Sequence, residues 1–247
     1  METLVLEKRD AVAWVWLNRP QRLNTIDPTM FDELRQTFEA LDGDDAIKAV
    51  VLAGRGETFS AGFDVSWMVG LTPETVAADI GEVRALYDVI EGCAKPLVVA
   101  VHGPAVGGAL LLVLVADLVL ASEEAGFGAP EVKLGFFPPL DLVPRLERRV
   151  GLGAAKQIVL TGELIDATEA HRIGLVERVV PEEALYEQAQ ELAERLAALP
   201  SSGVQLAKQA FAAARREDYG AWEAVHIADC WASQERKTAM DAFLEAE

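Results

Sequence analysis

The stretch HGPAVGGALLLVLVAD, residues 102–117, decides how the centre of this sequence is interpreted. It lies in a longer run, from Leu97 to Ala116, that contains no Asp, Glu, Lys or Arg. About 20 apolar residues are enough for one helix to cross the hydrocarbon core of a bilayer. The first question is therefore whether this run is a membrane anchor or the buried centre of a globular protein.

Proline and glycine interrupt the run. Pro104 lacks a backbone donor and restricts the residue before it, and the pair Gly107-Gly108 is a second break. What remains is a buried strand over 97–101, a glycine-containing turn and an apolar helix over about 106–115. Since neither piece alone is long enough to span a bilayer, we expect a buried strand–turn–helix and no membrane anchor.

The composition is that of a globular protein of one large domain, or of one domain with a helical appendage. Hydrophobic residues make up 51% of the 247 residues and charged residues 25%. The 22 basic and 40 acidic residues give a net charge of -18. Such a surface repels phosphate backbones and anionic lipids, which argues against nucleic-acid and membrane partners. The N-terminus lacks the features of a signal peptide, so we expect a cytoplasmic protein.

Cysteine and histidine are few and scattered. The two cysteines are Cys93 and Cys230, and the three histidines are His102, His171 and His226. Because their spacing matches no zinc motif, we predict no metal site, and we expect no disulfide framework.

Apolar periodicity predicts a mixed α/β core followed by helices. Strands are predicted over 11–18, 49–54, 95–103, 117–122 and 174–181, and helices over 29–44 and 73–93. From Glu182 onward the chain is predicted to be helical, with Pro200 ending the first of these helices. We therefore expect an α/β core over residues 1–180 and a helical segment over residues 181–247.

The turn at Gly107-Gly108 is suited to chemistry. Glycine lets backbone N–H groups approach a ligand closely, and the first amides of a helix have no partner within it. The N–H of Gly108 is thus a natural donor to an oxygen that gains negative charge during a reaction. Close packing of helix and strand is the simpler explanation of a glycine pair taken alone.

A second glycine turn follows the predicted strand 49–54. Ala61 and Gly62 form a turn that can present the N–H of Phe63, and Asp64 is placed to cap a following helix. Two amides from two loops would make an oxyanion hole, which suits a carbonyl that becomes an enolate.

One carboxylate, Glu131, lies among apolar residues in the segment GAPEVKLGFF, residues 128–137. Apolar neighbours raise the pKa of a carboxyl group toward the range in which it can accept and return protons. The alternative is a surface glutamate in a loop.

These motifs resemble the enoyl-CoA hydratase/isomerase (crotonase) family along essentially the whole chain. The matching segments are LNRPQRLNTID, GETFSAGFDV, KPLVVAVHGPAVGGALLLVLVADLVLAS, FGAPEVKLGFFP, LTGELIDATEAHRIGLVERVVP and TAMDAFLEAE. The resemblance implies an α/β fold, a spiral of ββα units, with a C-terminal helical segment that forms trimers or dimers of trimers. It also implies a coenzyme A thioester substrate and no separate cofactor. By motif position, the amides of Phe63 and Gly108 would hold the thioester carbonyl, beside Ala61, Gly62 and Asp64.

The sequence departs from the family's hydratases at one catalytic position. The hydratases that this chain resembles use two glutamates to bind and activate one water molecule. At the position of the first glutamate, this chain has Leu111. A leucine cannot hold or deprotonate water. Members that keep only the second glutamate, which is Glu131 here, resemble Δ3–Δ2 enoyl-CoA isomerases. A single carboxylate suffices for that reaction, and an apolar Leu111 helps to keep water out.

Three further predictions concern the surroundings of the site. Asp141 is either an N-cap of the helix that follows it or an auxiliary acid that replaces the lost carboxylate. Arg22 is either a contact for the anionic coenzyme A or a solvated surface arginine. Trp67 and Met68 border the acyl pocket, although core packing would explain them equally well.

Three functional hypotheses follow. The first is an enoyl-CoA isomerase that uses Glu131 alone. The second is a hydratase that uses Glu131 together with Asp141. The third is an acyl-CoA-binding protein without catalytic activity.

Overall fold

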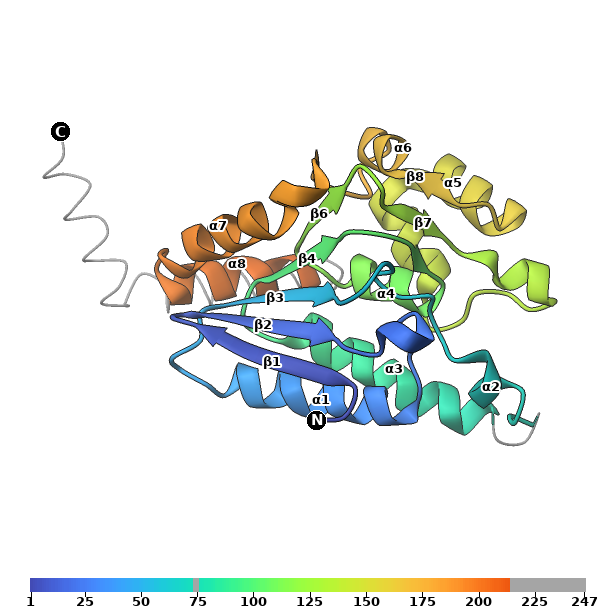
Figure 1. Ribbon diagram of the computed structural model, residues 1–247, viewed down its shortest axis with the longest axis horizontal. Helices are drawn as coiled ribbons and strands as arrows, with labels where there is room; N and C mark the ends of the chain where they lie inside the picture. Colours follow the sequence, from blue (N-terminus) through green and yellow to red (C-terminus); the bar gives the residue numbers. More distant parts are fainter. Residues whose placement is uncertain (73–75, 214–247) are drawn as a thin grey trace, which may run out of the picture.

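The computed structural model describes residues 1–72 and 76–213. The strands in these ranges are β1 (Leu4–Arg9), β2 (Val12–Leu17), β3 (Ala49–Gly54), β4 (Leu97–Val101), β5 (Ala105–Val106), β6 (Leu118–Ser122), β7 (Gly126–Gly128), β8 (Ile165–Asp166) and β9 (Arg178–Val180). Six of them form one sheet in the order β1-β2-β3-β4-β6-β9, and β5, β7 and β8 form a second (Figure 1). Within the large sheet, β1 and β2 pair antiparallel and all other neighbours pair parallel.

The helices connect these strands and cover both faces of the large sheet. They are α1 (Pro28–Asp42), α2 (Val65–Met68), α3 (Val76–Gly92), α4 (Gly108–Leu114), α5 (Leu142–Thr161), α6 (Ala167–Arg172), α7 (Leu185–Ala197) and α8 (Ser201–Ala213). Short 3-10 helices span Pro20–Arg22, Pro130–Leu134 and Glu182–Ala184. Figure 1 shows α1 and α3 along one face of the sheet and α7 along the other.

Alternate residues of the central strands serve two different cores. Val50 and Val99 are buried in the core that includes α1, α3 and α4. Val51 and Val98 are buried on the opposite face, together with residues of α7. Because successive side chains of a strand point to opposite faces, β3 and β4 must be apolar throughout. Burial on both faces explains why the sequences of β3 and β4 contain no charged residue. It also holds the ends of these two strands in place, and the loops with the glycine turns begin at these ends.

The uncharged run 97–116 folds as the sequence predicts, into the strand β4, a turn and the helix α4. The turn also contains β5, which the sequence did not predict. In the part of the chain that the structure describes, no helix combines the length and apolarity needed to cross a membrane.

Other sequence predictions agree to different degrees with the structure. The predicted strand 49–54 coincides with β3, whereas the strand predicted over 174–181 is wrong at its start. Gly174 has a φ of 79°, which breaks an extended strand, so only residues 178–180 pair with β6. β5, β7 and β8 are two or three residues long, too short to show a periodic pattern. The predicted helical character and trimerisation role of residues 214–247 lie outside the described residues.

A buried asparagine ties together the loops that follow β2 and β3. The Asn24 side chain is fully buried. Its amide donates to the carbonyls of Arg55 and Thr58, each at 2.8 Å, and its carbonyl accepts from the N–H of Arg19 at 2.8 Å. The backbone carbonyl of Asn24 accepts a further hydrogen bond, from the Ser60 hydroxyl at 2.7 Å. Asn24 therefore holds the start of the loop that carries the Gly62 turn.

Asn24→Ala is expected to lower the free energy of unfolding by roughly 3 kcal/mol, because it removes four hydrogen bonds to the backbone and leaves the buried Phe59 carbonyl without this partner. Urea unfolding measures this change. The control is Asn18→Ala, since the half-buried Asn18 side chain makes no hydrogen bond within the described residues. We expect that variant to change stability by less than about 0.5 kcal/mol. Similar losses in both variants would contradict the role assigned to Asn24.

Candidate active site

The loops that follow β3 and β4 are joined by backbone hydrogen bonds. The N–H of Ser60 donates to the carbonyl of Pro104 at 3.0 Å, and the N–H of Val106 donates to the carbonyl of Ser60 at 3.2 Å. Parallel neighbours such as β3 and β4 end at the same edge of a sheet, which is where α/β proteins usually bind ligands. These bonds therefore bring the two predicted glycine turns together at that edge.

The amide of Phe63 is oriented by its pairing with Ile26. The N–H of Ile26 donates to the Gly62 carbonyl at 2.8 Å, and the N–H of Asp64 donates to the Ile26 carbonyl at 2.9 Å. In extended chain, successive N–H groups point to opposite sides, so the N–H of Phe63 points away from Ile26. Among the described residues, it donates to no backbone carbonyl.

The turn at Gly62 closely approaches the first residue of α4. Gly62 has a φ of +87°, and a Cβ atom added to it would lie 3.2 Å from the nitrogen of Gly108 and 2.4 Å from the carbonyl oxygen of Val106. Only glycine accommodates both the conformation and the contact. As the first residue of α4, Gly108 has no helical partner for its N–H. The structure thus brings the segments that carry the two predicted donors into contact.

Glu131 reaches the same place from the small sheet. β5 and β7 pair in parallel, with Val106 opposite Gly128, and the N–H of Gly107 donates to the Gly128 carbonyl at 2.9 Å. The 3-10 helix Pro130–Leu134 begins two residues later and contains Glu131. A Cβ atom added to Gly107 would lie 2.8 Å from Oε1 of Glu131, so the carboxylate lies directly against that glycine.

The Glu131 carboxylate is buried and forms no ion pair with a cation of residues 1–72 or 76–213. The residue is 6% exposed, and its Oε2 atom has no hydrogen-bond partner. Burial raises the pKa of this carboxyl above its ordinary value. A buried carboxyl with a raised pKa and an uncommitted oxygen is suited to exchanging a proton with a bound molecule.

Glu131→Gln is expected to stabilise the fold in a pH-dependent way. Because the folded state holds the Glu131 proton more tightly than the unfolded chain does, native stability falls as pH rises from about 4.3 to the raised pKa. The glutamine variant does not titrate there, so its advantage in unfolding free energy should grow across this window and then stay constant. Urea unfolding at a series of pH values measures the difference.

The control for this measurement is the same substitution at the exposed Glu124. It removes one negative charge from the surface and should show no comparable growth with pH. A Glu131→Gln advantage that stays constant or shrinks as pH rises would contradict the burial of an unpaired carboxylate.

Tyr87 is a residue that the sequence analysis missed. It lies on α3, is fully buried, and donates a hydrogen bond from its hydroxyl to the Gly108 carbonyl at 2.8 Å. Burial, with a smaller contribution from the negative charge of Glu131, raises the pKa of Tyr87, so the hydroxyl stays protonated and remains a donor. It fixes the first turn of α4 from the side of α3. A helical tyrosine among apolar residues gives no sequence signal for this contact.

A cavity of about 380 Å³ opens beside the glycine turns. Its wall shares one residue with the predicted oxyanion hole, namely Phe63, whose ring covers Gly108: a Cβ atom added to Gly108 would lie 2.8 Å from that ring. The described residues that line the cavity are Phe63, Trp67, Met68, Leu71, Ile80, Val83, Phe136, Phe137, Pro139 and Leu140. The structure therefore places Trp67 and Met68 on a cavity adjacent to the glycine turns.

Asp141 does not line this cavity. It occupies the N-cap position of α5, but its side chain makes no capping hydrogen bond, so the capping interpretation is wrong. Its φ is 59°, a left-handed conformation, and its carboxylate forms an ion pair with Arg84 of α3 instead. Leu111 is buried in the first turn of α4. Its N–H donates to the carbonyl of Gly107, the N-cap residue of that helix, at 3.3 Å.

The remaining predicted residues have structural contacts or lie at the surface. Asp64 caps α2 as predicted, accepting from the N–H of Ser66 at 3.0 Å. The N–H of Ala61 donates to the Leu23 carbonyl at 3.0 Å, which anchors the turn. Arg22 is exposed at the end of the first 3-10 helix and forms no ion pair within the described residues.

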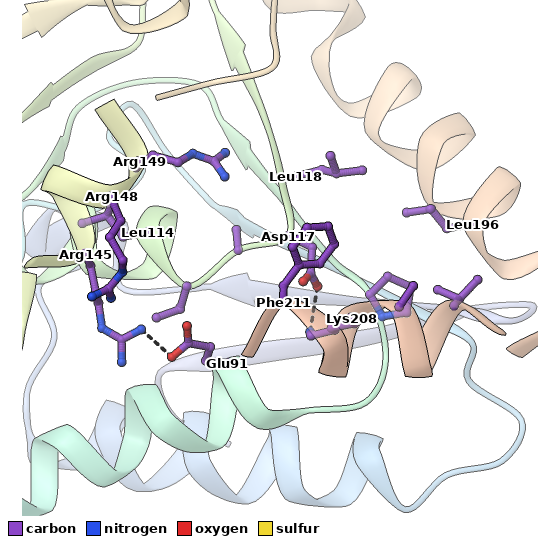
Figure 2. Close-up of a pocket in the computed structure, with 15 residues that line it drawn as sticks. Glu91, Leu114, Asp117, Leu118, Arg145, Arg148, Arg149, Leu196, Lys208 and Phe211 are labelled. Atoms are coloured by element: carbon purple, nitrogen blue, oxygen red, sulfur yellow. Dashed lines mark hydrogen bonds and ion pairs between the residues drawn. The ribbon is translucent and has the colours of Figure 1, made fainter. Parts of the chain in front are cut away.

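A larger cavity, of about 660 Å³, lies between α5 and α8 (Figure 2). Three arginines of α5 line it. Two ion pairs between lining residues lie in its wall, Arg145–Glu91 at 2.5 Å and Lys208–Asp117 at 2.7 Å. None of the residues predicted for the site borders this cavity. In residues 1–72 and 76–213, His, Cys, Asp and Glu side chains form no cluster that could hold a metal ion.

The overall architecture is that of a crotonase-like α/β protein. A solved structure of an enoyl-CoA hydratase from Bacillus anthracis superposes with a TM-score of 0.94 at 29% identity, covering 99% of this chain and 97% of that one. One from Geobacillus kaustophilus gives 0.93 at 33% identity, covering 99% and 96%.

The chain belongs to the enoyl-CoA hydratase/isomerase family, whose model matches residues 7–247. It is 34% identical to a crotonyl-CoA hydratase of Syntrophomonas wolfei, with 99% of this chain and 95% of that protein covered. It is 39% identical to a probable enoyl-CoA hydratase of Rhizobium meliloti, with 85% of this chain and 80% of that protein covered. The chain is therefore an enzyme of this family.

Proposed function

We propose that the protein moves a double bond in an enoyl-CoA thioester, from the Δ3 to the Δ2 position, with Glu131 as its single acid/base. The observation that carries this proposal is the placement of Glu131. It lies buried against Gly107. By resemblance to the family's hydratases, Leu111 occupies the position of the first glutamate, and this buried leucine cannot activate water. Coenzyme A enters as part of the substrate, and we propose no separate cofactor.

The reaction needs one base that transfers a proton and a site that stabilises one oxyanion. The Glu131 carboxylate takes a proton from C2 of the 3-enoyl thioester, and the electron pair of that C–H bond delocalises to the thioester oxygen. The N–H groups of Phe63 and Gly108 stabilise the resulting dienolate. The double bond then forms between C2 and C3 as C4 takes the proton back from Glu131. Atoms and charge balance without a second catalytic group.

The paired substrate assay tests this proposal. With a 3-enoyl-CoA, the absorbance band of the conjugated thioester should appear, and with a trans-2-enoyl-CoA in water the same band should not disappear. Glu131→Gln should lower the rate of band appearance by at least about 1,000-fold, because no other buried base is proposed for the proton. Glu124→Gln should retain the rate. Turnover retained in Glu131→Gln would refute the role of Glu131.

Hydration is the second candidate function, because relatives at 33–40% identity are named as a crotonyl-CoA hydratase or as probable or putative enoyl-CoA hydratases. It would require a group other than Leu111 to hold water, and Asp141 is the acid considered for that role. Its ion pair with Arg84, outside the lining of the cavity, argues against it.

Asp141→Asn distinguishes the two candidates. Under isomerisation by Glu131 alone, this variant should keep its rate with a 3-enoyl-CoA within about threefold, because Asp141 touches no proposed substrate position. Under hydration, loss of the Asp141 carboxylate would abolish the disappearance of the trans-2-enoyl band. The two rates, measured in wild type and variant, separate these outcomes.

A further inference from the structure

The size and lining of the cavity beside Phe63 indicate which acyl chains can bind. The chemistry of the reaction does not, because it involves only the carbons next to the thioester. The cavity adjoins the proposed carbonyl site, because Phe63, whose backbone follows the Gly62 turn and whose ring covers Gly108, is also one of the residues that line the cavity. An acyl chain bound with its carbonyl between the two turns therefore has this cavity as the adjacent space for its distal carbons.

The described lining of the cavity is apolar. Its side chains are aromatic, aliphatic or, at Met68, a thioether, and the only strong side-chain hydrogen-bonding group among the described ones is the indole N–H of Trp67. One wall is a set of rings in edge-to-face contact, with Phe31 behind Phe63 and Trp67 at centroid distances of 5.8 and 5.3 Å. A carboxylate or hydroxyl at the end of an acyl chain would lose its hydration here, and the Trp67 indole N–H is the one strong donor among the described lining side chains that could replace it.

The volume sets the length of the chain. At ~30 Å³ for each small group in a dense liquid, a cavity of about 380 Å³ holds roughly a dozen non-hydrogen atoms when completely filled. A four-carbon acyl group ends at C4, which itself takes part in the proposed isomerisation, so it would leave most of the space empty. Phe137 at the mouth, 73% exposed, adds apolar surface that a longer chain would cover.

We propose that this cavity binds the distal carbons of an acyl chain of about eight carbons or more, of which at least about four lie beyond C4, and that is apolar to its end. The inference rests on the proposed function only in taking a coenzyme A thioester as the ligand. It names the substrate class of the same site, and it holds for either reaction of the bound thioester.

The test is the binding of saturated thioesters, which do not react. Dissociation constants of butanoyl-CoA, octanoyl-CoA and octanedioyl-CoA are measured by calorimetry on the full chain. Octanoyl-CoA should bind at least about tenfold more tightly than butanoyl-CoA, because four more methylenes leave water. Octanedioyl-CoA, whose terminal carboxylate is charged, should bind at least about tenfold more weakly than octanoyl-CoA.

Matched variants locate the effect in the cavity. Val83→Phe on α3 fills part of the cavity and should reduce the ratio of octanoyl to butanoyl affinity to near one. Val89→Phe introduces the same side chain on the same helix outside the described lining and should retain the ratio. If Val83→Phe fails to fold, Leu71→Trp fills the cavity from the segment after α2.

The outcomes separate the two proposals. Equal affinities for butanoyl-CoA and octanoyl-CoA in the wild type, or an unchanged ratio in the folded cavity-filling variant, would overturn the inference about the acyl chain. A chain-length preference without double-bond migration would leave the inference standing and refute the proposed isomerisation. Absence of binding by every thioester would overturn both.

Discussion

The site depends on one close approach of backbone to backbone, between the Gly62 turn and the start of α4. A Cβ atom at position 62 would collide with the Val106 carbonyl, and one at Gly107 would collide with the Glu131 carboxylate. Positive φ values at both glycines add a conformational reason to the steric one. The two turns and the Glu131 carboxylate can therefore lie together only because positions 62 and 107 are glycines.

The large sheet makes this approach rigid. β3 and β4 are buried on both faces, so the points from which the two loops leave the sheet cannot shift without disturbing two cores. Ser60, Asn24 and Tyr87 then connect the loops and α4 by buried hydrogen bonds. Among the residues that the structure describes, Glu131 has no cationic partner, and one of its carboxylate oxygens accepts no hydrogen bond, which costs stability at neutral pH. Such costs are expected where a group must act on a ligand.

Much of this could be predicted from the sequence, because proline, glycine and apolar periodicity have local consequences. The break at Pro104 and Gly107-Gly108, the strand at 49–54 and the cap at Asp64 are of that kind. What could not be predicted depends on segments distant in the chain. The bond from Tyr87 to Gly108, the β5–β7 pairing that places Glu131, and the ion pair that turns Asp141 toward Arg84 have no local signature. The cavity, too, is formed by residues from three separate segments.

The central claim is that one buried carboxylate carries the same proton from C2 to C4. The most direct measurement follows a 3-enoyl-CoA deuterated at C2 as it reacts in ordinary water, with NMR or mass spectrometry locating the label in the product. A carboxyl that is 6% exposed exchanges slowly with solvent, so the account predicts deuterium at C4 of the 2-enoyl product at early reaction times. A product with only solvent hydrogen at C4, or a 3-hydroxyacyl product, would contradict it.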